Sequence, residues 1–278
     1  MNAELIDASK ISLEGKVAIV TGAARMSGIG RSIALALAGA GADVALSGSG
    51  SKSSSWPEEE IKAGWRGLDS VADEIRAMGR RAEVFIADLR SSTAVDAMVA
   101  DVVKRLGRVD ILINNAAAPV GDDRGELVNI TDEAWMRVID VKLNGAFYAS
   151  RAVAREFRKQ GQGGRVVNIS SIGGKRGAAK IGAYGVANAG LQALGASLAR
   201  DMATEGVTVN SICVGATLTA RIKGMQQEGY FQEFVETVPM KRAADPSEIA
   251  NVAVFLCSPQ ASYITAQSIN VDGGALYL

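Results

Sequence analysis

Short apolar runs alternate with longer amphipathic stretches along the whole chain, and this alternation restricts the possible folds more than any other feature of the sequence. The runs are rich in Val, Ile and Leu and are bounded by Gly, which is typical of buried strands. They lie at Val17–Val20, Val44–Ser47, Ala82–Ala87, Val109–Ile113, Arg165–Ile169, Val207–Cys213 and Ser268–Val271. Periodicity predicts helices between them, at residues 30–40, 67–79, 92–106, 132–160, 184–205 and 246–257.

Strands that alternate with helices predict an α/β fold whose parallel sheet is covered on both faces. Right-handed crossovers wind such a sheet into a doubly wound, Rossmann-type fold of about seven strands, which binds nucleotides at the carboxyl ends of its strands. No linker, run of like charge or repeat divides the 278 residues, so we expect one domain over residues 1–278. The Ser- and Gly-rich segment at about 49–66 is expected to be an inserted loop within that domain.

The composition argues against several classes of function. The 30 Lys and Arg residues are balanced by 30 Asp and Glu residues, so the excess of positive charge that nucleic-acid binding needs is missing. The absence of His removes His-based acid/base catalysis and most zinc sites, and we predict no metal site. Without a signal peptide or an apolar run of membrane length, we expect a cytoplasmic protein that does not bind membranes. Cys213 and Cys257 lie in apolar stretches and are predicted to be buried thiols.

A glycine-rich segment joins the first predicted strand to the first predicted helix. Glycines in this strand–turn–helix context let a pyrophosphate approach the amino end of the helix, where unpaired N–H groups and the helix dipole favour anions. The segment is Thr21-Gly22-Ala23-Ala24-Arg25-Met26-Ser27-Gly28-Ile29-Gly30. We therefore predict that the phosphates of a dinucleotide cofactor bind here, at Gly22, Arg25, Gly28, Ile29 and Gly30.

Further motifs follow along the chain: Ala87-Asp88-Leu89, Asn114-Asn115-Ala116-Ala117, Ser171 followed by Tyr184, and Asp272-Gly273-Gly274. Together with the glycine-rich loop they resemble the short-chain dehydrogenase/reductase family, whose T-G-x-x-x-G-x-G loop here has two extra residues before Gly28. The resemblance implies a hydride transfer between NADP(H) or NAD(H) and a small-molecule alcohol or ketone. It also implies cofactor contacts at Asp88, Leu89, Asn115, Ala116 and Thr219.

The catalytic positions implied by this resemblance depart from the family pattern. In the family, a Tyr is the general acid or base, a Ser orients the substrate oxygen, and a Lys four residues after the Tyr lowers the pKa of the Tyr and holds the ribose. Tyr184 and Ser171 fit, but Asn188 stands where Lys is expected. Lys142 stands where the family has an Asn on the preceding helix, so the two residue types are exchanged.

The exchange leaves three interpretations open. In the first, Lys142 restores the positive charge beside Tyr184, and the chain is an active enzyme with the catalytic set Ser171, Tyr184, Lys142 and Asn188. In the second, the enzyme is active but slow, because a neutral Asn188 can hydrogen-bond the ribose but supplies no charge. In the third, the chain is a cofactor-binding pseudoenzyme or a partner subunit without redox turnover. Non-redox chemistry such as dehydration also stays open.

The residues after the second predicted strand bear on the choice of cofactor. A carboxylate there would bind the ribose hydroxyls of NAD and repel the extra phosphate of NADP. The chain has Ser47-Gly48-Ser49 instead, and Arg25 and Lys52 can supply positive charge nearby. We therefore predict that NADP(H) is favoured over NAD(H).

The substrate itself is not identified by the sequence. The resemblance implies a substrate lid over about residues 217–240, and the cations Lys175, Arg176 and Lys180 lie between Ser171 and Tyr184, where either a solvated loop or an acidic substrate explains them. Family members usually associate through their two longest helices, here at 132–160 and 184–205. Small residues such as those from Ala189 to Ala199 permit close packing of helices, so we expect a homotetramer.

Overall fold

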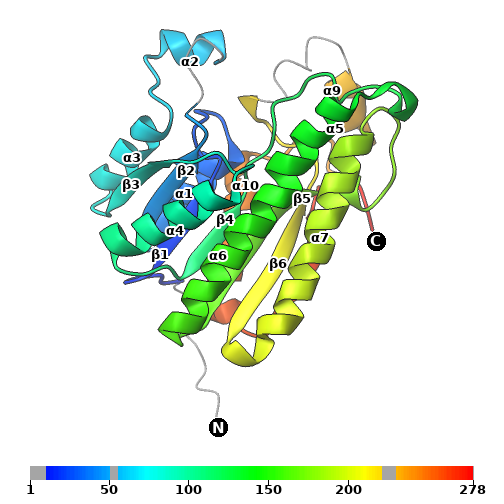
Figure 1. Ribbon diagram of the computed structural model, residues 1–278. Coiled ribbons are helices and arrows are strands. Elements are labelled where there is room, and N and C mark those ends of the chain that lie inside the picture. The colour runs from blue at the N-terminus through cyan, green and yellow to red at the C-terminus, as the bar shows by residue number, and fades with distance from the viewer. Residues whose placement is uncertain (1–10, 51–55, 221–229, 278) are drawn as a thin grey trace.

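One parallel sheet forms the centre of the computed structural model, which describes residues 11–50, 56–220 and 230–277 (Figure 1). Its strands are β1 (Val17–Thr21), β2 (Asp43–Gly48), β3 (Ala82–Ile86), β4 (Ile111–Asn114), β5 (Gly164–Ser171), β6 (Val207–Val214) and β7 (Ser268–Val271). They lie in the order β3-β2-β1-β4-β5-β6-β7, and every neighbouring pair is parallel. The predicted α/β, doubly wound Rossmann-type fold is therefore confirmed.

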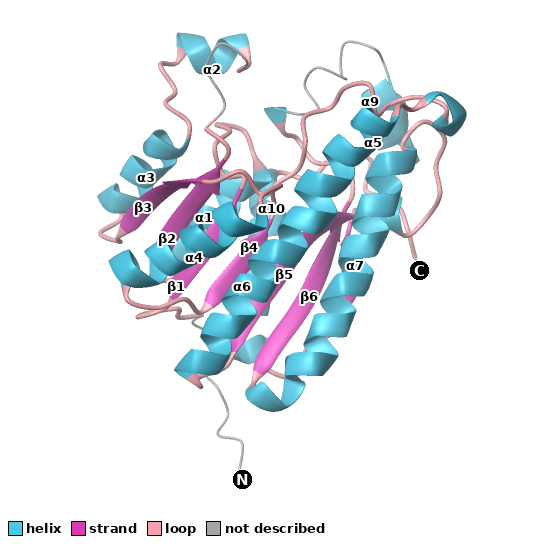
Figure 2. Cartoon of the chain, in the orientation of Figure 1, coloured by secondary structure: helices cyan, strands magenta, loops and turns pink. Residues whose placement is uncertain are grey.

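Helices cover both faces of this sheet (Figure 2). The helices α1 (Ile29–Gly39), α3 (Leu68–Ala77) and α10 (Pro246–Cys257) pack on one face, and α4 (Ser92–Leu106), α6 (Gly145–Gln160) and α7 (Gly182–Met202) pack on the other. Side chains of a strand alternate between the two cores: Ala18 and Val20 pack with α1, whereas Val17 and Ile19 pack with α4 and α6. The strands therefore need apolar residues on both faces, which explains their continuous hydrophobic runs.

Local sequence signals fix several helix ends. The hydroxyl of Ser91 accepts a hydrogen bond from Ala94 N at the start of α4, and Gly107, with φ of 90°, ends that helix. At α10, Asp245 and Glu248 form a capping box. The side chain of Asp245 accepts a hydrogen bond from the backbone N–H of Glu248, and the side chain of Glu248 accepts one from the backbone N–H of Asp245.

The structure corrects the predicted elements in two places. The helix predicted at 132–160 is divided into α5 (Asp132–Ile139), a π-helical turn (Asp140–Asn144) and α6. The segment at 49–66 is not only a loop, because it contains the short helix α2 (Glu58–Lys62). The predicted lid at 217–240 contains α9 (Tyr230–Thr237), and its residues 221–229 lie outside the described residues.

Two expectations drawn from composition can be compared with the structure. Cys213 and Cys257 are free and buried, as predicted. Burial raises the pKa of Cys213, and it raises the pKa of Cys257 to about 12, so both thiols stay protonated at neutral pH. In the described part of the chain, none of the helices has both the length and the apolar character needed to cross a membrane.

Candidate active site

The motifs singled out in the sequence meet at the carboxyl edge of the sheet. The strand order reverses between β1 and β4, which is the switch point where open α/β sheets bind ligands. The glycine-rich loop follows β1, and the segment that begins at Asn114 follows β4. Ser171 is the last residue of β5, and Tyr184 lies in the first turn of α7. Residues far apart in the sequence are thus brought to one edge of the sheet.

Close backbone packing explains the glycines of the loop. Gly22 has φ of +72°, and a Cβ atom on it would lie 2.7 Å from Ala116 Cα. A Cβ atom on Gly30 would lie 2.5 Å from Asn115 Nδ2 and 2.7 Å from Gly22 O. Asn115 Nδ2 donates to the carbonyl oxygens of Thr21 and Gly22 at 2.9 and 3.0 Å, so this side chain fastens the loop to the end of β4.

The amino end of α1 is left without a side-chain cap. Gly28 is the N-cap residue in an extended conformation, and within residues 11–50, 56–220 and 230–277 no side chain caps the first N–H groups of the helix. Ile29 is the first helical residue. An uncapped helix start beside closely packed glycines is the arrangement that binds phosphate in dinucleotide-binding folds.

A buried carboxylate holds the part of the loop that carries the two extra residues. Glu60, on α2, is 0% exposed; it accepts a hydrogen bond from Met26 N at 2.8 Å and pairs with Arg25 Nη1 at 3.2 Å. Trp65 Nε1 donates to Ala24 O at 2.8 Å, so the inserted segment packs directly against the loop. The charge of Arg25 is therefore partly balanced within the protein. Sequence reasoning missed Glu60, because nothing in its local pattern distinguishes it from the exposed Glu58 and Glu59.

The remaining predicted cofactor residues lie around the same edge. Ala220 N donates to Ser27 O at 2.8 Å, which brings Thr219 next to the extended loop. Asp88 is half-exposed and is held by Arg90; the hydrogen bond from Arg90 keeps the pKa of that carboxyl below its ordinary value. The second predicted source of charge, Lys52, lies outside the described residues.

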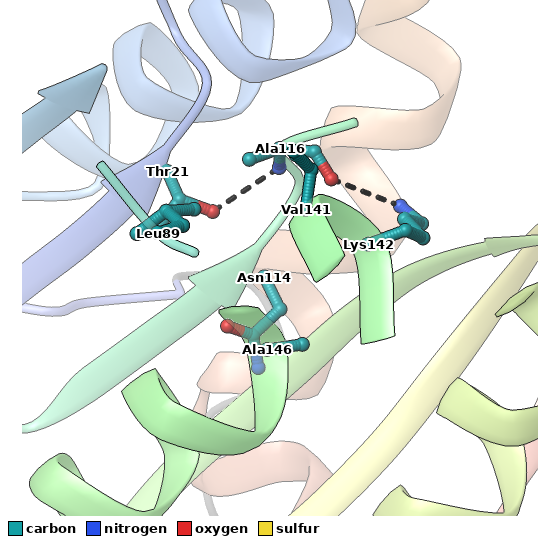
Figure 3. Close-up of a pocket in the computed structure, with 7 residues that line it drawn as sticks. All are labelled: Thr21, Leu89, Asn114, Ala116, Val141, Lys142 and Ala146. Atoms are coloured by element: carbon teal, nitrogen blue, oxygen red, sulfur yellow. Dashed lines mark hydrogen bonds between the residues drawn. The ribbon is translucent and has the colours of Figure 1, made fainter. Parts of the chain in front are cut away.

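Lys142 lies at a small pocket between the glycine-rich loop and the π-helical turn (Figure 3). Its lining residues are Thr21, Leu89, Asn114, Ala116, Val141, Lys142 and Ala146. Thr21 Oγ1 accepts from Ala116 N at 3.1 Å, and Lys142 Nζ donates to Ala116 O at 3.4 Å. Three of the residues predicted to bind the cofactor or to act in catalysis line this pocket, namely Leu89, Ala116 and Lys142.

Lys142 is a buried cation, with 5% of the residue exposed. It lies on the π-helical turn Asp140–Asn144, a local irregularity that is frequent at functional sites. Its Nζ atom donates a 2.6 Å hydrogen bond to the carbonyl oxygen of Ile169, near the end of β5. A buried ammonium group needs such acceptors, because losing water without replacement partners is costly. The turn thus directs Lys142 inward to the ends of β4 and β5.

The side chains of Ser171 and Tyr184 both approach Gly173. A Cβ atom on Gly173 would be 3.4 Å from Ser171 Oγ and 3.5 Å from Tyr184 Cε1, so the structure brings these two predicted catalytic side chains together. The hydroxyl of Ser171 accepts from Gly173 N at 3.0 Å and donates to Val214 O at 3.4 Å, which fixes its position.

Asn188 lies one helical turn after Tyr184 and is 1% exposed. Its Nδ2 atom donates to Tyr184 O at 2.8 Å. Its Oδ1 atom is buried and, among the described residues, receives no hydrogen bond. A buried acceptor without a donor is costly, so this atom is suited to a hydroxyl group of a bound molecule.

Arg124, which the sequence did not single out, lies over the ring of Tyr184. Its Cζ atom is 4.6 Å from the ring centroid. Its Nε atom is 3.3 Å from the carboxylate of Asp123, which is almost completely buried. The loop after β4 has no regular pattern in sequence, so only the fold shows that Arg124 reaches Tyr184.

The three cations between Ser171 and Tyr184 in the sequence do not share one environment. Lys175 Nζ donates to Ser268 O at 2.7 Å, which directs this side chain toward β7. Arg176 and Lys180 are exposed.

Comparisons with known proteins agree with this geometry. The family model described as enoyl-(acyl carrier protein) reductase matches residues 22–275. The chain is 35% identical to the 3-oxoacyl-[acyl-carrier-protein] reductase of Vibrio cholerae, over 95% of this chain and 98% of that protein. It is 36% identical to the cyclohexanol dehydrogenase of Rhodococcus sp., over 96% of this chain and 98% of that protein.

A solved structure with bound cofactor is also similar. It is that of a candidate 2-deoxy-D-gluconate 3-dehydrogenase from Agrobacterium tumefaciens with bound NADP, with a TM-score of 0.82 and 31% identity, covering 95% of this chain and 97% of that one. The fold, the order of the motifs and these similarities agree over almost the whole length of the sequence. The chain therefore belongs to the short-chain dehydrogenase/reductase family of NAD(P)-dependent oxidoreductases.

Proposed function

We propose that this protein transfers a hydride between a nicotinamide cofactor and the carbonyl carbon of a small-molecule ketone, or the reverse from the alcohol, with Tyr184 as general acid and base. The observation that carries the proposal is that the side chains of Ser171 and Tyr184 both approach Gly173, at the switch-point edge of the sheet. In the reducing direction the hydroxyl of Tyr184 donates a proton to the carbonyl oxygen, while that of Ser171 holds this oxygen by a hydrogen bond.

Lys142 supplies the positive charge that the family pattern places four residues after the Tyr. When Tyr184 has given up its proton, a nearby cation stabilises the negative oxygen, and burial of Lys142 strengthens this effect by excluding water. Asn188, whose buried Oδ1 atom receives no hydrogen bond from the described part of the chain, accepts one from a ribose hydroxyl. The exchanged pair therefore divides between two residues the tasks that one lysine performs in the usual pattern.

The residues at the switch point fit a dinucleotide. The closely packed Gly22 and Gly30 and the uncapped start of α1 at Gly28 would hold the pyrophosphate. The rest of the proposed binding set lies around them and consists of Arg25, Ile29, Asp88, Leu89, Asn115, Ala116 and Thr219. When bound, the cofactor supplies or accepts the hydride.

The proposed preference is for NADP(H) over NAD(H). It is supported by the absence of a carboxylate at Ser47-Gly48-Ser49 and by the NADP bound to the Agrobacterium protein. Arg25 makes one hydrogen bond to Glu60, and a guanidinium has further N–H groups that can meet a phosphate. Equal kcat/KM values with NADPH and NADH would contradict the preference.

We further propose a homotetramer built on α5, α6 and α7. These helices carry the exposed apolar side chains Met136, Phe147 and Val186, which are 44%, 40% and 49% exposed in the single chain. Apolar side chains on packed helices are typical of subunit interfaces. Sedimentation velocity at micromolar concentration tests this, and a monomer there would reject it.

The variant Tyr184→Phe tests the proposed reaction. We expect a fall in kcat on the order of 10²- to 10⁴-fold, because one general acid is removed. Cofactor affinity, measured by fluorescence titration with NADPH, should stay unchanged. Tyr263→Phe is the matched control, since Tyr263 is fully exposed. A wild-type protein that binds NADPH but turns over none of a broad panel of alcohols and ketones would instead be a pseudoenzyme.

A further inference from the structure

We propose that Arg124 binds a carboxylate of the substrate, so that the substrates are short oxo acids and the corresponding hydroxy acids. This inference rests on the proposed function, because it assumes that the carbonyl to be reduced lies at Tyr184 and Ser171. Three observations carry it: the position of Arg124 over Tyr184, the rigid loop that holds it, and the surrounding charges.

Arg124 lies beside the reacting position. Its Cζ atom is 4.6 Å from the centroid of the Tyr184 ring, within the range of about 6 Å in which a cation interacts with an aromatic face. The guanidinium is therefore a few ångströms from the hydroxyl that the proposed reaction uses. A substrate whose carbonyl oxygen is bound at Tyr184 and Ser171 places its next one or two carbon atoms in the neighbourhood of Arg124.

The backbone around Arg124 is fixed against the start of α7. Gly125 N donates to Lys180 O at 3.2 Å, and Gly125 pairs with Ile181 in an isolated parallel bridge. Arg124 N donates to Gly121 O at 3.0 Å, which closes a turn before it. The side chain of Arg124 is 22% exposed, so it is largely withdrawn from water. A cation held in this way is ordered before a substrate arrives, which lowers the entropic cost of binding.

The charges near Arg124 leave it able to bind an anion. Asp123 is 1% exposed and lies between two guanidinium groups, 3.3 Å from Arg124 Nε and 3.6 Å from Arg137 Nη2. Asp123 also accepts a hydrogen bond from Gly121 N at 3.0 Å. The other acid of the cluster, Asp122, is 79% exposed and pairs with Arg137 at 3.7 Å. One buried carboxylate, that of Asp123, is thus shared by two partly exposed arginines. It orients Arg124, and its single negative charge does not neutralise both guanidinium groups.

A carboxylate is the group that matches this arrangement. Guanidinium binds carboxylate through two parallel hydrogen bonds, and such charge-assisted bonds are stronger than neutral ones. In the reduction, the carbonyl carbon gains a hydride and the nicotinamide is oxidised, while the carbonyl oxygen gains the proton of Tyr184 and becomes the hydroxyl of a hydroxy acid. A neutral ketone of the same size leaves Arg124 without an anion, so the site discriminates against it.

The test compares acids with their methyl esters in wild-type protein and in Arg124→Gln. The probes are 2-oxobutanoate and 3-oxobutanoate, each with its methyl ester, and NADPH oxidation is followed. We expect the wild-type protein to prefer the acids, and Arg124→Gln to lower kcat/KM for the acids by about 10- to 100-fold, the usual effect of losing a hydrogen bond between charged groups. The esters should change less than about 3-fold. Arg200→Gln, an exposed arginine on α7, should change neither.

Two results would overturn the inference. Equal turnover of acids and esters by the wild-type protein would show that no carboxylate is recognised. An equal loss for acids and esters in Arg124→Gln would show that Arg124 only positions Tyr184.

If no probe is turned over, the proposed redox function is contradicted for these substrates. Carboxylate binding by Arg124 is then tested on its own by calorimetry. Binding of 2-oxobutanoate to the NADPH-loaded wild-type protein that is lost in Arg124→Gln would support recognition. The absence of binding to the wild-type protein would overturn it.

Discussion

The ammonium nitrogen of Lys142 lies 2.6 Å from the carbonyl oxygen of Ile169, two residues before Ser171. The π-helical turn that carries Lys142 and the burial of the side chain together place its amino group at the ends of β4 and β5. The usual lysine of the family lies four residues after the Tyr, on the helix that corresponds to α7. In the roles proposed above, the π-helical turn supplies this lysine instead.

The exchange of Lys142 and Asn188 can be tested by reversing it. We expect Lys142→Asn to lower kcat/KM by about 100-fold or more, because general acid/base catalysis loses its supporting charge. Asn188→Lys alone places two cations in one site and should also lower kcat/KM. The double variant, which has the usual family pattern, should recover to within about 10-fold of wild type. Thermal unfolding of each variant separates loss of activity from loss of structure, and full activity in Lys142→Asn would contradict the assigned role.

The buried Glu60 should influence both stability and the choice of cofactor. Glu60→Gln keeps the shape of the side chain but removes its charge, so the pair with Arg25 is lost. We expect a lower melting temperature, because a hydrogen bond to a charged group contributes roughly 1.5–3 kcal/mol. With the negative charge gone, the ratio of NADPH to NADH affinity should rise. Glu58→Gln is the control, because Glu58 lies on the same helix but its ion pair with Lys62 is exposed, and an unchanged ratio in Glu60→Gln would show that Glu60 acts on structure alone.

A methyl group on Gly30 should disrupt the loop, since its Cβ atom would lie 2.5 Å from Asn115 Nδ2 and 2.7 Å from Gly22 O. Overpacking of this kind typically costs about 1–3 kcal/mol. We therefore expect Gly30→Ala to lower both the melting temperature and the affinity for NADPH. The matched control is Gly177→Ala, because a Cβ atom there would meet nothing within 4 Å. Equal behaviour of the two variants would contradict the described packing.

The capping box of α10 should make part of the stability depend on acid pH. The hydrogen bond from Arg242, together with that from Asp245 N, lowers the pKa of Glu248 from its ordinary 4.5 to about 2. A carboxyl whose pKa is lower in the folded protein stabilises the fold above pH 4.5, and this contribution disappears as the pH falls toward 2.

Melting temperatures of wild type and Glu248→Gln should therefore differ at pH 7 and converge on acidification to pH 2. Glu233→Gln, at an exposed glutamate on α9, is the control and should change little at either pH. A difference that stays constant across this range would show that the capping interaction does not depend on the charge of Glu248.

Regular patterns allowed most of the fold to be predicted. All the strands were found. The central strands such as β1 and β4 are buried on both faces and are continuous apolar runs, whereas the edge strands β3 and β7 are only partly buried but keep enough apolar residues to be recognised. The interruption of the helix at 132–160 was not predicted, because a π-helical turn adds a residue to one turn without removing the amphipathic pattern on either side. The helix α2 was missed because its residues, apart from Ile61, are charged and gave no periodic signal.

The site was predicted less completely. The glycines were located because they follow the first strand and precede a helix, and Ser171, Tyr184, Lys142 and Asn188 were located by the resemblance to the family's motifs. Arg124 and Glu60 could not be found in this way. Both lie outside the long elements, and only the folded chain shows that one covers Tyr184 and the other holds the glycine-rich loop.

The position of the lysine on the π-helical turn, and not on α7, also bears on how such a chain can have evolved. A sequence with the usual pattern and the present one each hold a single lysine at the two exchanged positions. Any path between them that changes one position at a time passes through a protein with two lysines there or with none. In the proposed roles, the form without a lysine lacks the supporting charge and the form with two lysines carries one charge too many, so we expect the exchange to require two coupled substitutions.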